Sequence, residues 1–329
     1  MSEQYILVTG STGFIGRHVV RKLARVQDLR LLCIVRGGER HPQANSLLNQ
    51  GATLVGGEFC DEILLKRTFG QYQIRQVVHL AAIRGARKAS PADFRRVNIE
   101  GTALLLREAH QHRVQKFIHC SSVGVYGTIP TAVPAGVETP LRGDTHYHQS
   151  KVAAEEAVHG YIQKGLNAYI VRPAIAYGPG DDGFPQTLVE LVRRHLLRLP
   201  KSNYRVHLVD VEQLAEVFVN LVVRDHCTQR IFVAADFEPV PLNELVDWIH
   251  WHFYRRPYPR FLRLPDWTFG LAFHLFRGLG NEKWAVRVAL ICRDWYYQSA
   301  DTYRTLGIQP GSTREGFGRF LGENATFPR

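Results

Sequence analysis

Tyr147 and Lys151 are four residues apart, and their side chains are of the types that move protons. Residues four apart share one face of a helix, so we expect the phenol and the ammonium group to lie together. A free phenol has a pKa of about 10 and keeps its proton near neutral pH. A nearby ammonium group favours phenolate, so we expect Lys151 to lower the pKa of Tyr147 and prepare it for acid–base catalysis. Ser122 precedes Tyr147 and offers a hydroxyl that can orient a substrate oxygen.

A glycine-rich turn follows the first apolar run of the chain. Glycines at positions 10, 13 and 16 allow a tight turn and a close approach of the backbone to a pyrophosphate. A helix that starts here would add free N–H groups and a partial positive charge. The alternative is a glycine turn without a ligand. The residues expected to contact a cofactor are Gly10, Thr12, Gly13, Phe14, Ile15 and Gly16.

Strand and helix patterns alternate around these motifs. Short apolar runs predict strands at Tyr5–Val8, Leu31–Val35, Thr53–Val55, Gln76–Ala81, Phe117–Cys120 and Ala168–Val171. Helical spacing predicts helices at Phe14–Val26, Phe94–His110 and Ser150–Gln163. This alternation predicts an α/β Rossmann fold, a doubly wound parallel sheet covered by helices on both faces.

Composition limits the class of protein. The net charge is +11, which suits anionic substrates, cofactor phosphates, nucleic acid or an anionic membrane. The basic residues are spread along the chain without a nucleic-acid motif, so we expect no nucleic-acid partner. No basic segment with an apolar core precedes the first strand, and no run reaches about 18 apolar residues. The cysteines fit a reduced, cytoplasmic compartment and show no metal-ligand spacing, and they are Cys33, Cys60, Cys120, Cys227 and Cys292.

Together with Arg172–Pro173 and the turn 177–181, these motifs resemble the extended short-chain dehydrogenase/reductase superfamily, which includes nucleotide-sugar epimerases and dehydratases. The matching motifs lie close together up to about Asp181, and the resemblance is looser beyond it. It implies an NAD(P)-dependent enzyme whose catalytic residues are Ser122, Tyr147 and Lys151. Tyr147 would pass a proton to or from a substrate oxygen while hydride moves to or from the nicotinamide. Lys151 would also hold the nicotinamide ribose.

The resemblance implies further cofactor contacts. Arg36 ends the second strand, where NAD-selective relatives usually carry an acidic residue, so we expect NADP, with NAD as the alternative. A solvent-exposed arginine is the other explanation of Arg36. Glu58 matches a position near the adenine, and an ordinary surface carboxylate is equally consistent. The remaining expected contacts, beside the adenosine ribose and near the nicotinamide, are Leu80, Ala81, Ala82 and Pro173.

The pattern becomes irregular after Asp181. Val206–Val223 predicts a short strand and a helix, and Arg230–Ala234 predicts another strand. In the family such segments return to the nucleotide domain. We therefore assign residues 1–181 and 206–235 to the dinucleotide-binding domain. Residues 182–205 and 236–329 form a smaller, discontinuous substrate domain.

Three functions remain open. The first is an NAD(P)-dependent reductase or dehydrogenase for an apolar ketone or alcohol, as in the 3β-hydroxysteroid dehydrogenase and dihydroflavonol reductase branch. Arg36 and the proline-led segment 263–267 favour it. The second is a nucleotide-sugar epimerase or dehydratase with tightly held NAD, although residues 199–205 lack the glycines usual there. The third is a non-catalytic dinucleotide-binding scaffold, against which Ser122, Tyr147 and Lys151 argue.

Partners other than a small-molecule substrate are also open. Relatives often dimerise through the helix that carries Tyr147, so a homodimer is one expectation. All five tryptophans lie between Trp248 and Trp295, in an aromatic and basic segment that predicts a pocket wall or a peripheral membrane contact. Packing within the small domain is the alternative. The side chains expected to face the pocket or the membrane are Trp267, Phe269, Phe273 and Phe276. Candidates for substrate contact, with a solvated loop as the alternative, are Arg84, Arg87, Lys88, His146 and His148.

Overall fold

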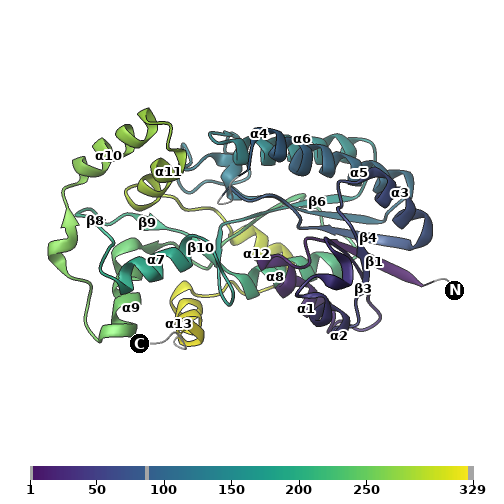
Figure 1. Cartoon of the computed structure of the whole chain (residues 1–329), viewed down its shortest axis with the longest axis horizontal. Helices are drawn as coiled ribbons and strands as arrows, with labels where there is room; N and C mark the ends of the chain where they lie inside the picture. Colours follow the sequence, from purple (N-terminus) through teal and green to yellow (C-terminus); the bar gives the residue numbers. More distant parts are fainter. Residues whose placement is uncertain (1–2, 86–88, 325–329) are drawn as a thin grey trace.

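A seven-stranded parallel sheet dominates the computed structural model, which describes residues 3–85 and 89–324 (Figure 1). The strand order is β11-β6-β5-β4-β1-β2-β3, and it reverses between β1 and β4. Ligands of doubly wound folds bind outside the carboxyl ends of the strands at such a reversal. The predicted Rossmann fold is therefore confirmed. The strands are β1 (Gln4–Thr9), β2 (Arg30–Val35), β3 (Thr53–Gly56), β4 (Gln73–His79), β5 (Lys116–Cys120), β6 (Ala168–Pro173) and β11 (Ile231–Ala234).

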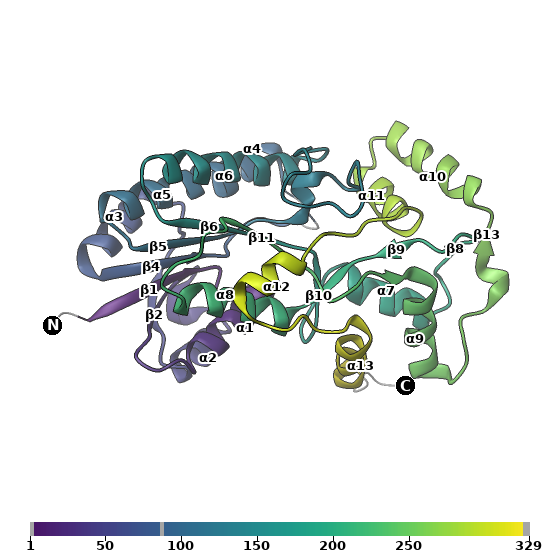
Figure 2. The same ribbon diagram turned by 180° about the vertical axis from the view of Figure 1, so that it is seen from behind.

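Helices cover both faces of the sheet (Figures 1 and 2). Successive strand residues point to opposite faces, so Ile6 and Val8 enter one apolar core while Leu7 enters the other. The first core contains residues of α1 (Phe14–Leu23), α2 (Ala44–Asn49) and α8 (Val211–Val223). The second contains residues of α3 (Glu62–Gln71), α5 (Gly101–Gln111) and α6 (His146–Gln163).

Several predicted boundaries were wrong. The strand predicted at Gln76–Ala81 ends at His79, because its neighbour β1 ends at Thr9, the register partner of His79. The helix predicted at Phe94–His110 is divided into α4 (Pro91–Phe94), a π-helical segment at Arg95–Glu100, and α5. The sequence analysis missed α2 and α3. Helix α3 had a readable signal, since Asp61 caps it by accepting hydrogen bonds from the backbone N–H groups of Ile63 and Leu64.

The chain after β6 builds a smaller region from helices and two-stranded ladders. Its ladders pair β7 (Ile175–Tyr177) with β10 (Leu208–Asp210), β8 (Leu199–Pro200) with β13 (Arg263–Leu264), and β9 (Arg205–Val206) with β12 (Val240–Pro241). Its helices are α7 (Phe184–Arg193), α9 (Leu242–Tyr254), α10 (Asp266–Gly278), α11 (Glu282–Ile291) and α13 (Thr313–Asn324). Helix α12 (Ala300–Leu306) packs against α8 and β11. The proposed domain boundaries stay a prediction.

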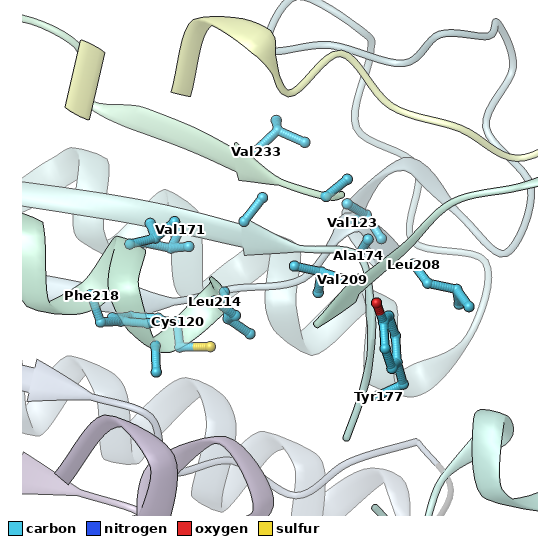
Figure 3. Packing of buried hydrophobic residues seen from close by; sticks show 14 of the residues in the cluster. Cys120, Val123, Val171, Ala174, Tyr177, Leu208, Val209, Leu214, Phe218 and Val233 are labelled. Atoms are coloured by element: carbon cyan, nitrogen blue, oxygen red, sulfur yellow. The ribbon is translucent and has the colours of Figure 1, made fainter. Parts of the chain in front are cut away.

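Apolar side chains join the two regions without a break. Val171 of β6, Val233 of β11, Leu214 of α8 and Leu208 of β10 belong to one buried cluster, together with Tyr177 (Figure 3). This packing fixes the carboxyl edge of the sheet relative to the smaller region. Among the residues that the structure describes, no helix is long and apolar enough to span a membrane.

Candidate active site

The glycine turn between β1 and α1 is tightly packed. A methyl group on Gly16 would lie 2.0 Å from the carbonyl oxygen of Gly10. One on Gly10, whose φ is +74°, would lie 2.6 Å from the backbone nitrogen of Ala81. Helix α1 then begins at Phe14, with no side-chain cap and no acidic residue in its first turn. The turn therefore presents a glycine backbone and an uncapped helix N-terminus, which together suit a pyrophosphate.

The ends of β1 and β4 meet beside this turn. The backbone N–H of Leu80 donates to the carbonyl of Thr9 at 3.1 Å, and that of Ala81 lies 3.4 Å from Thr9 Oγ1. The buried ring of His79 bonds Thr9 Oγ1 at 2.7 Å and Thr102 Oγ1 at 2.9 Å. Burial lowers the pKa of His79 to about 3, so this ring is neutral and holds the two strand ends in place. The segment 80–82 thus lies beside the glycine turn.

Ser122, Tyr147 and Lys151 come together where β5 and the start of α6 meet. Ser122 follows β5, and Tyr147 and Lys151 lie in the first turns of α6, which Thr145 caps. The Nζ of buried Lys151 donates to the carbonyl oxygen of Cys120 at 2.6 Å. Burial lowers the pKa of Lys151.

The pKa of Tyr147 moves opposite to the sequence prediction. Burial raises it to about 12, and the hydrogen bond with Ser122 offsets only part of this rise. The ammonium group of Lys151 is directed to the Cys120 carbonyl, and burial is the main cause of the raised pKa of Tyr147. Tyr147 is therefore a neutral phenol near pH 7, the form that donates a proton.

Asn98 connects the loop after β4 to the first turn of α6. It lies in the π-helical segment, and its side chain is buried. Its Nδ2 donates to Ser150 Oγ at 2.9 Å and to the carbonyl of Ile83 at 3.0 Å, while its Oδ1 accepts from the N–H of Ile83 at 2.8 Å. Ser150 Oγ in turn donates to the carbonyl of Tyr147 at 2.7 Å. Asn98 thus positions the backbone that carries Tyr147.

A buried ion pair joins three elements of the site. Arg172 of β6 donates to both carboxylate oxygens of Glu155 on α6, at 2.6 to 3.2 Å, and to Tyr126 Oη at 2.9 Å. Burial disfavours the charged guanidinium, but the bonds to Glu155 outweigh it and raise the pKa of Arg172. The neighbouring Pro173 ends β6 beside Ala234 of β11. Arg172 therefore holds α6 against the sheet.

The adenosine side of the expected cofactor site contains charges of both signs. Arg36 is exposed at the end of β2. Glu58 follows β3 and accepts a hydrogen bond from Arg96 at 3.1 Å. This bond, opposed by partial burial, lowers the pKa of Glu58, and the charge of Arg36 adds to the effect. Glu58 is thus a paired carboxylate rather than an isolated surface group.

His148 and Asp144 form a pair beside Ser122. Asp144 Oδ1 lies 2.5 Å from His148 Nδ1, and its other oxygen accepts from the N–H of Thr128 at 2.8 Å. Burial opposes these bonds, but they hold the pKa of Asp144 below its ordinary value. A methyl group on Gly124 would lie 2.7 Å from His148 Nε2 and 3.2 Å from Ser122 Oγ. The ring of His148 therefore packs against Gly124, close to Ser122.

The other candidates for substrate contact are less informative. Arg84 pairs with Asp182 at 2.6 Å, His146 is exposed, and Arg87 and Lys88 lie outside the described residues. A cavity of about 580 Å³ lies elsewhere, between the loop 132–140 and the region of β11 and α12, and includes none of the predicted site residues. In the described part of the chain, no group of three or more His, Cys, Asp or Glu side chains could hold a metal ion.

Curated relatives with enzyme names match the chain over part of their length. UDP-glucose 4-epimerase of Erwinia amylovora is 33% identical over 164 residues, which are 48% of each protein. A 4-hydroxy-2-methyl-3-oxo-4-farnesyl-3,4-dihydroquinoline-1-oxide ketoreductase of Stigmatella aurantiaca is 28% identical over 193 residues, 58% of this chain and 56% of the relative. The chain therefore spans about half the length of these two relatives.

A solved structure and a family model also match this chain. The Bordetella bronchiseptica enzyme WbmG, solved in complex with NAD and UDP, superposes with a TM-score of 0.75 at 18% identity, over 96% of this chain and 92% of that one. The sequence model of one enzyme family matches residues 6–233. On this match, the chain belongs to the NAD dependent epimerase/dehydratase family.

Proposed function

We propose that the chain is an NAD(P)-dependent oxidoreductase that transfers hydride between a nicotinamide dinucleotide and a carbinol or ketone carbon. The observation that carries this proposal is the position of Ser122, Tyr147 and Lys151 at the carboxyl end of β5, on the same edge of the sheet where the glycine turn follows β1. Such a position supplies an acid–base group within reach of a cofactor edge. Among its relatives, one is named a ketoreductase and another a UDP-glucose 4-epimerase.

The residues of the chain fit a dinucleotide. Gly10 and Gly16 leave no room for a side chain, and the first turn of α1 offers uncapped N–H groups to a pyrophosphate. The hydroxyl of Ser11 is buried in the same turn. When bound, the nicotinamide group supplies or accepts the hydride.

The side chains of the chain then handle the proton and the orientation. Ser122 bonds the reacting oxygen of the substrate, and Tyr147 exchanges a proton with it. Because the Tyr147 phenol is neutral near pH 7, its resting form suits reduction of a carbonyl. In the reverse direction it must first lose its proton, which a cationic cofactor ring or a redirected Lys151 would favour.

His148 is a third group directed at the substrate. Asp144 fixes its Nδ1, so Nε2 is left to bond a substrate oxygen next to the one that Ser122 holds. Its neighbour His146 is exposed on the same helix turn and has no such placement.

NADP is the cofactor that Arg36 favours. An exposed guanidinium at the end of β2 can pair with a 2′-phosphate, and no acidic residue stands at that position. Glu58 does not oppose this choice, because Arg96 already neutralises it. NAD is the alternative supported by WbmG, a fold neighbour solved with that cofactor.

Two substrate classes are supported by different relatives. The Stigmatella ketoreductase supports an apolar ketone, and the Erwinia epimerase supports a nucleotide sugar. Arg36 favours the ketone, through the preference for NADP that it implies. The epimerase or dehydratase is the second candidate.

Oxidation of NADPH and NADH in the presence of bulky alicyclic and aromatic ketones tests the proposal, with UDP-glucose and dTDP-glucose assayed in parallel for isomerised or dehydrated products. Tyr147→Phe should lose nearly all turnover and keep cofactor affinity, because the ring stays and only the proton is lost. A Tyr147→Phe protein with near wild-type turnover would exclude this role. Sugar turnover without ketone reduction would establish the second candidate.

A further inference from the structure

The end of the molecule opposite the amino-terminus is basic and aromatic. Helix α9, the loop after it and helix α10 all lie at this end of the long axis in both views (Figures 1 and 2). Residues 251–265 contain four arginines and no aspartate or glutamate. Three of these arginines, Arg255, Arg256 and Arg260, are exposed.

Helix α10 adds an apolar face directed to solvent. Trp267, Leu271, Leu275 and Leu279 follow one another at intervals of four and are exposed to 70%, 64%, 57% and 71%. Of the side chains expected to face the pocket or the membrane, Trp267 belongs to this exposed face, whereas Phe269 and Phe276 do not. Phe269 is only 6% exposed, and Phe276 stacks on Trp284 of α11 with ring centroids 5.9 Å apart. Phe276 thus attaches α10 to α11, and the leucine face, which consists of Trp267, Leu271, Leu275 and Leu279, remains exposed in the described structure.

Exposed aromatic side chains also lie at this end of the molecule, on α9 and on the loop after it. Phe261 is 81% exposed and Trp251 is 52% exposed. Trp251 and Arg255 also line a groove of about 520 Å³, together with Trp248, His252 and Arg314. Arg314 lies over the Trp248 ring at 5.7 Å, and Asp247 is the one carboxylate among the lining residues. Cationic and indole groups thus surround a groove large enough for a polar headgroup.

We propose that this distal surface binds an anionic phospholipid bilayer. The distal surface consists of the leucine face of α10 together with Trp251, Arg255, Arg256, Arg260 and Phe261. Indole and phenyl rings prefer the headgroup level of a bilayer, and leucine side chains enter its acyl boundary. The arginines complement the negative surface potential. The charge of +11 on the whole chain acts in the same direction.

The charges favour a bilayer over a second copy of the chain. A twofold contact pairs this surface with itself, and residues 251–265 of one copy would offer no acidic side chain to the arginines of the other. An anionic bilayer requires no complementary patch on the protein, since its own headgroups supply the negative charge.

Co-sedimentation with phosphatidylcholine vesicles, with and without phosphatidylglycerol, tests this proposal on the full chain. Binding should require phosphatidylglycerol and weaken at high salt. Changing Arg255, Arg256 and Arg260 to Gln should weaken binding about fivefold per arginine, which is roughly 100-fold for all three. Changing Trp267, Leu271 and Leu275 to Ser should also release the protein from vesicles.

Matched controls keep the test specific. One control variant removes the same charge from other exposed positions and should leave vesicle binding close to wild type. It changes Arg25, Arg67 and Arg113 to Gln. A second control variant removes exposed apolar side chains from other positions and should also leave vesicle binding close to wild type. Its changes to Ser are at Ile63, Leu196 and Phe237. Unchanged thermal unfolding shows that each variant is folded.

Three results would overturn the proposal: no binding to anionic vesicles, equal binding to neutral vesicles, or equal losses in the control and test variants. Concentration-dependent dimers that disappear in the leucine-face variant, without vesicle binding, would assign the surface to a second copy instead. None of these results depends on turnover or on the bound cofactor.

Discussion

Replacing Glu155 by Gln should destabilise the protein strongly, because Glu155 is the counter-ion of buried Arg172. Both residues are at most 1% exposed, and the guanidinium makes three contacts of 2.6 to 3.2 Å with the carboxylate. Glutamine keeps the shape but removes the charge, and its amide NH₂ group faces the guanidinium donors. Breaking a buried pair by removing one partner costs about 3–5 kcal/mol.

The expected shift in melting temperature follows from the size of the chain. Roughly 2.1 cal/mol/K of unfolding entropy per residue gives about 0.7 kcal/mol/K for 329 residues. A loss of 3–5 kcal/mol then lowers Tm by about 4–7 °C. Differential scanning calorimetry at one scan rate measures this shift.

A partly exposed pair provides the control. Glu190 of α7 contacts Arg193 at 3.0 Å, but its side chain is 36% exposed, so Glu190→Gln should cost no more than about 1 kcal/mol and lower Tm by less than about 2 °C. Equal shifts for Glu155→Gln and Glu190→Gln would refute the reasoning, since they would show that burial adds nothing to the cost of an unpaired Arg172.

Three further predictions concern the site and its supports. His148→Gln should lower kcat/KM about 10- to 100-fold and change its pH profile, while His146→Gln should leave both unchanged; equal effects would remove His148 from the site. Arg36→Asp should reverse the preference for NADP(H) over NAD(H), and unchanged affinities would make Arg36 a surface charge. The hydrogen bond from His18, opposed by partial burial and aided by Arg21, lowers the pKa of Glu212 to about 2. Because folding lowers this carboxyl pKa, the ionised Glu212 stabilises the fold above its unfolded pKa of 4.5. This stabilisation is lost as pH falls toward 2. Glu212→Gln should therefore be less stable than wild type at pH 7, and denaturant unfolding should show this difference shrinking below about pH 4.5; a difference independent of pH would contradict the assignment.

The sequence predicted the parts of the site that depend on local geometry. The glycine spacing requires a tight strand-to-helix turn, and the interval between Tyr147 and Lys151 places both on one face of α6. The alternation of strand and helix patterns was enough to predict the Rossmann fold. These features depend on residues close together in the chain, whose periodicity is readable without tertiary contacts.

Tertiary contacts decided what the sequence could not predict. The direction of the Lys151 ammonium group depends on the carbonyl of Cys120, which lies 31 residues away in the chain. The pair of Glu155 and Arg172 joins a helix to a strand, and nothing in either segment alone indicates it. The sequence shows the type of each side chain, but it does not show which residue that side chain contacts.

Helix α10 shows the limit of periodicity. It has apolar residues on nearly every side, so both the phenylalanine stripe and the leucine stripe follow a helical repeat. Packing on α11 covers Phe276 of the phenylalanine stripe, which stacks on Trp284. The sequence could predict that the helix has an exposed face, but not which one.

Native mass spectrometry with NADPH, NADP, NADH and NAD tests the central claim most directly. We predict one dinucleotide per chain for the wild type and none for Gly10→Ala, whose methyl group would lie 2.6 Å from the backbone of Ala81. Gly160→Ala is the matched control, because a methyl group there meets nothing within 4 Å. Wild-type protein that binds none of the four dinucleotides, or Gly10→Ala protein that binds as wild type does, would contradict a cofactor at the glycine turn.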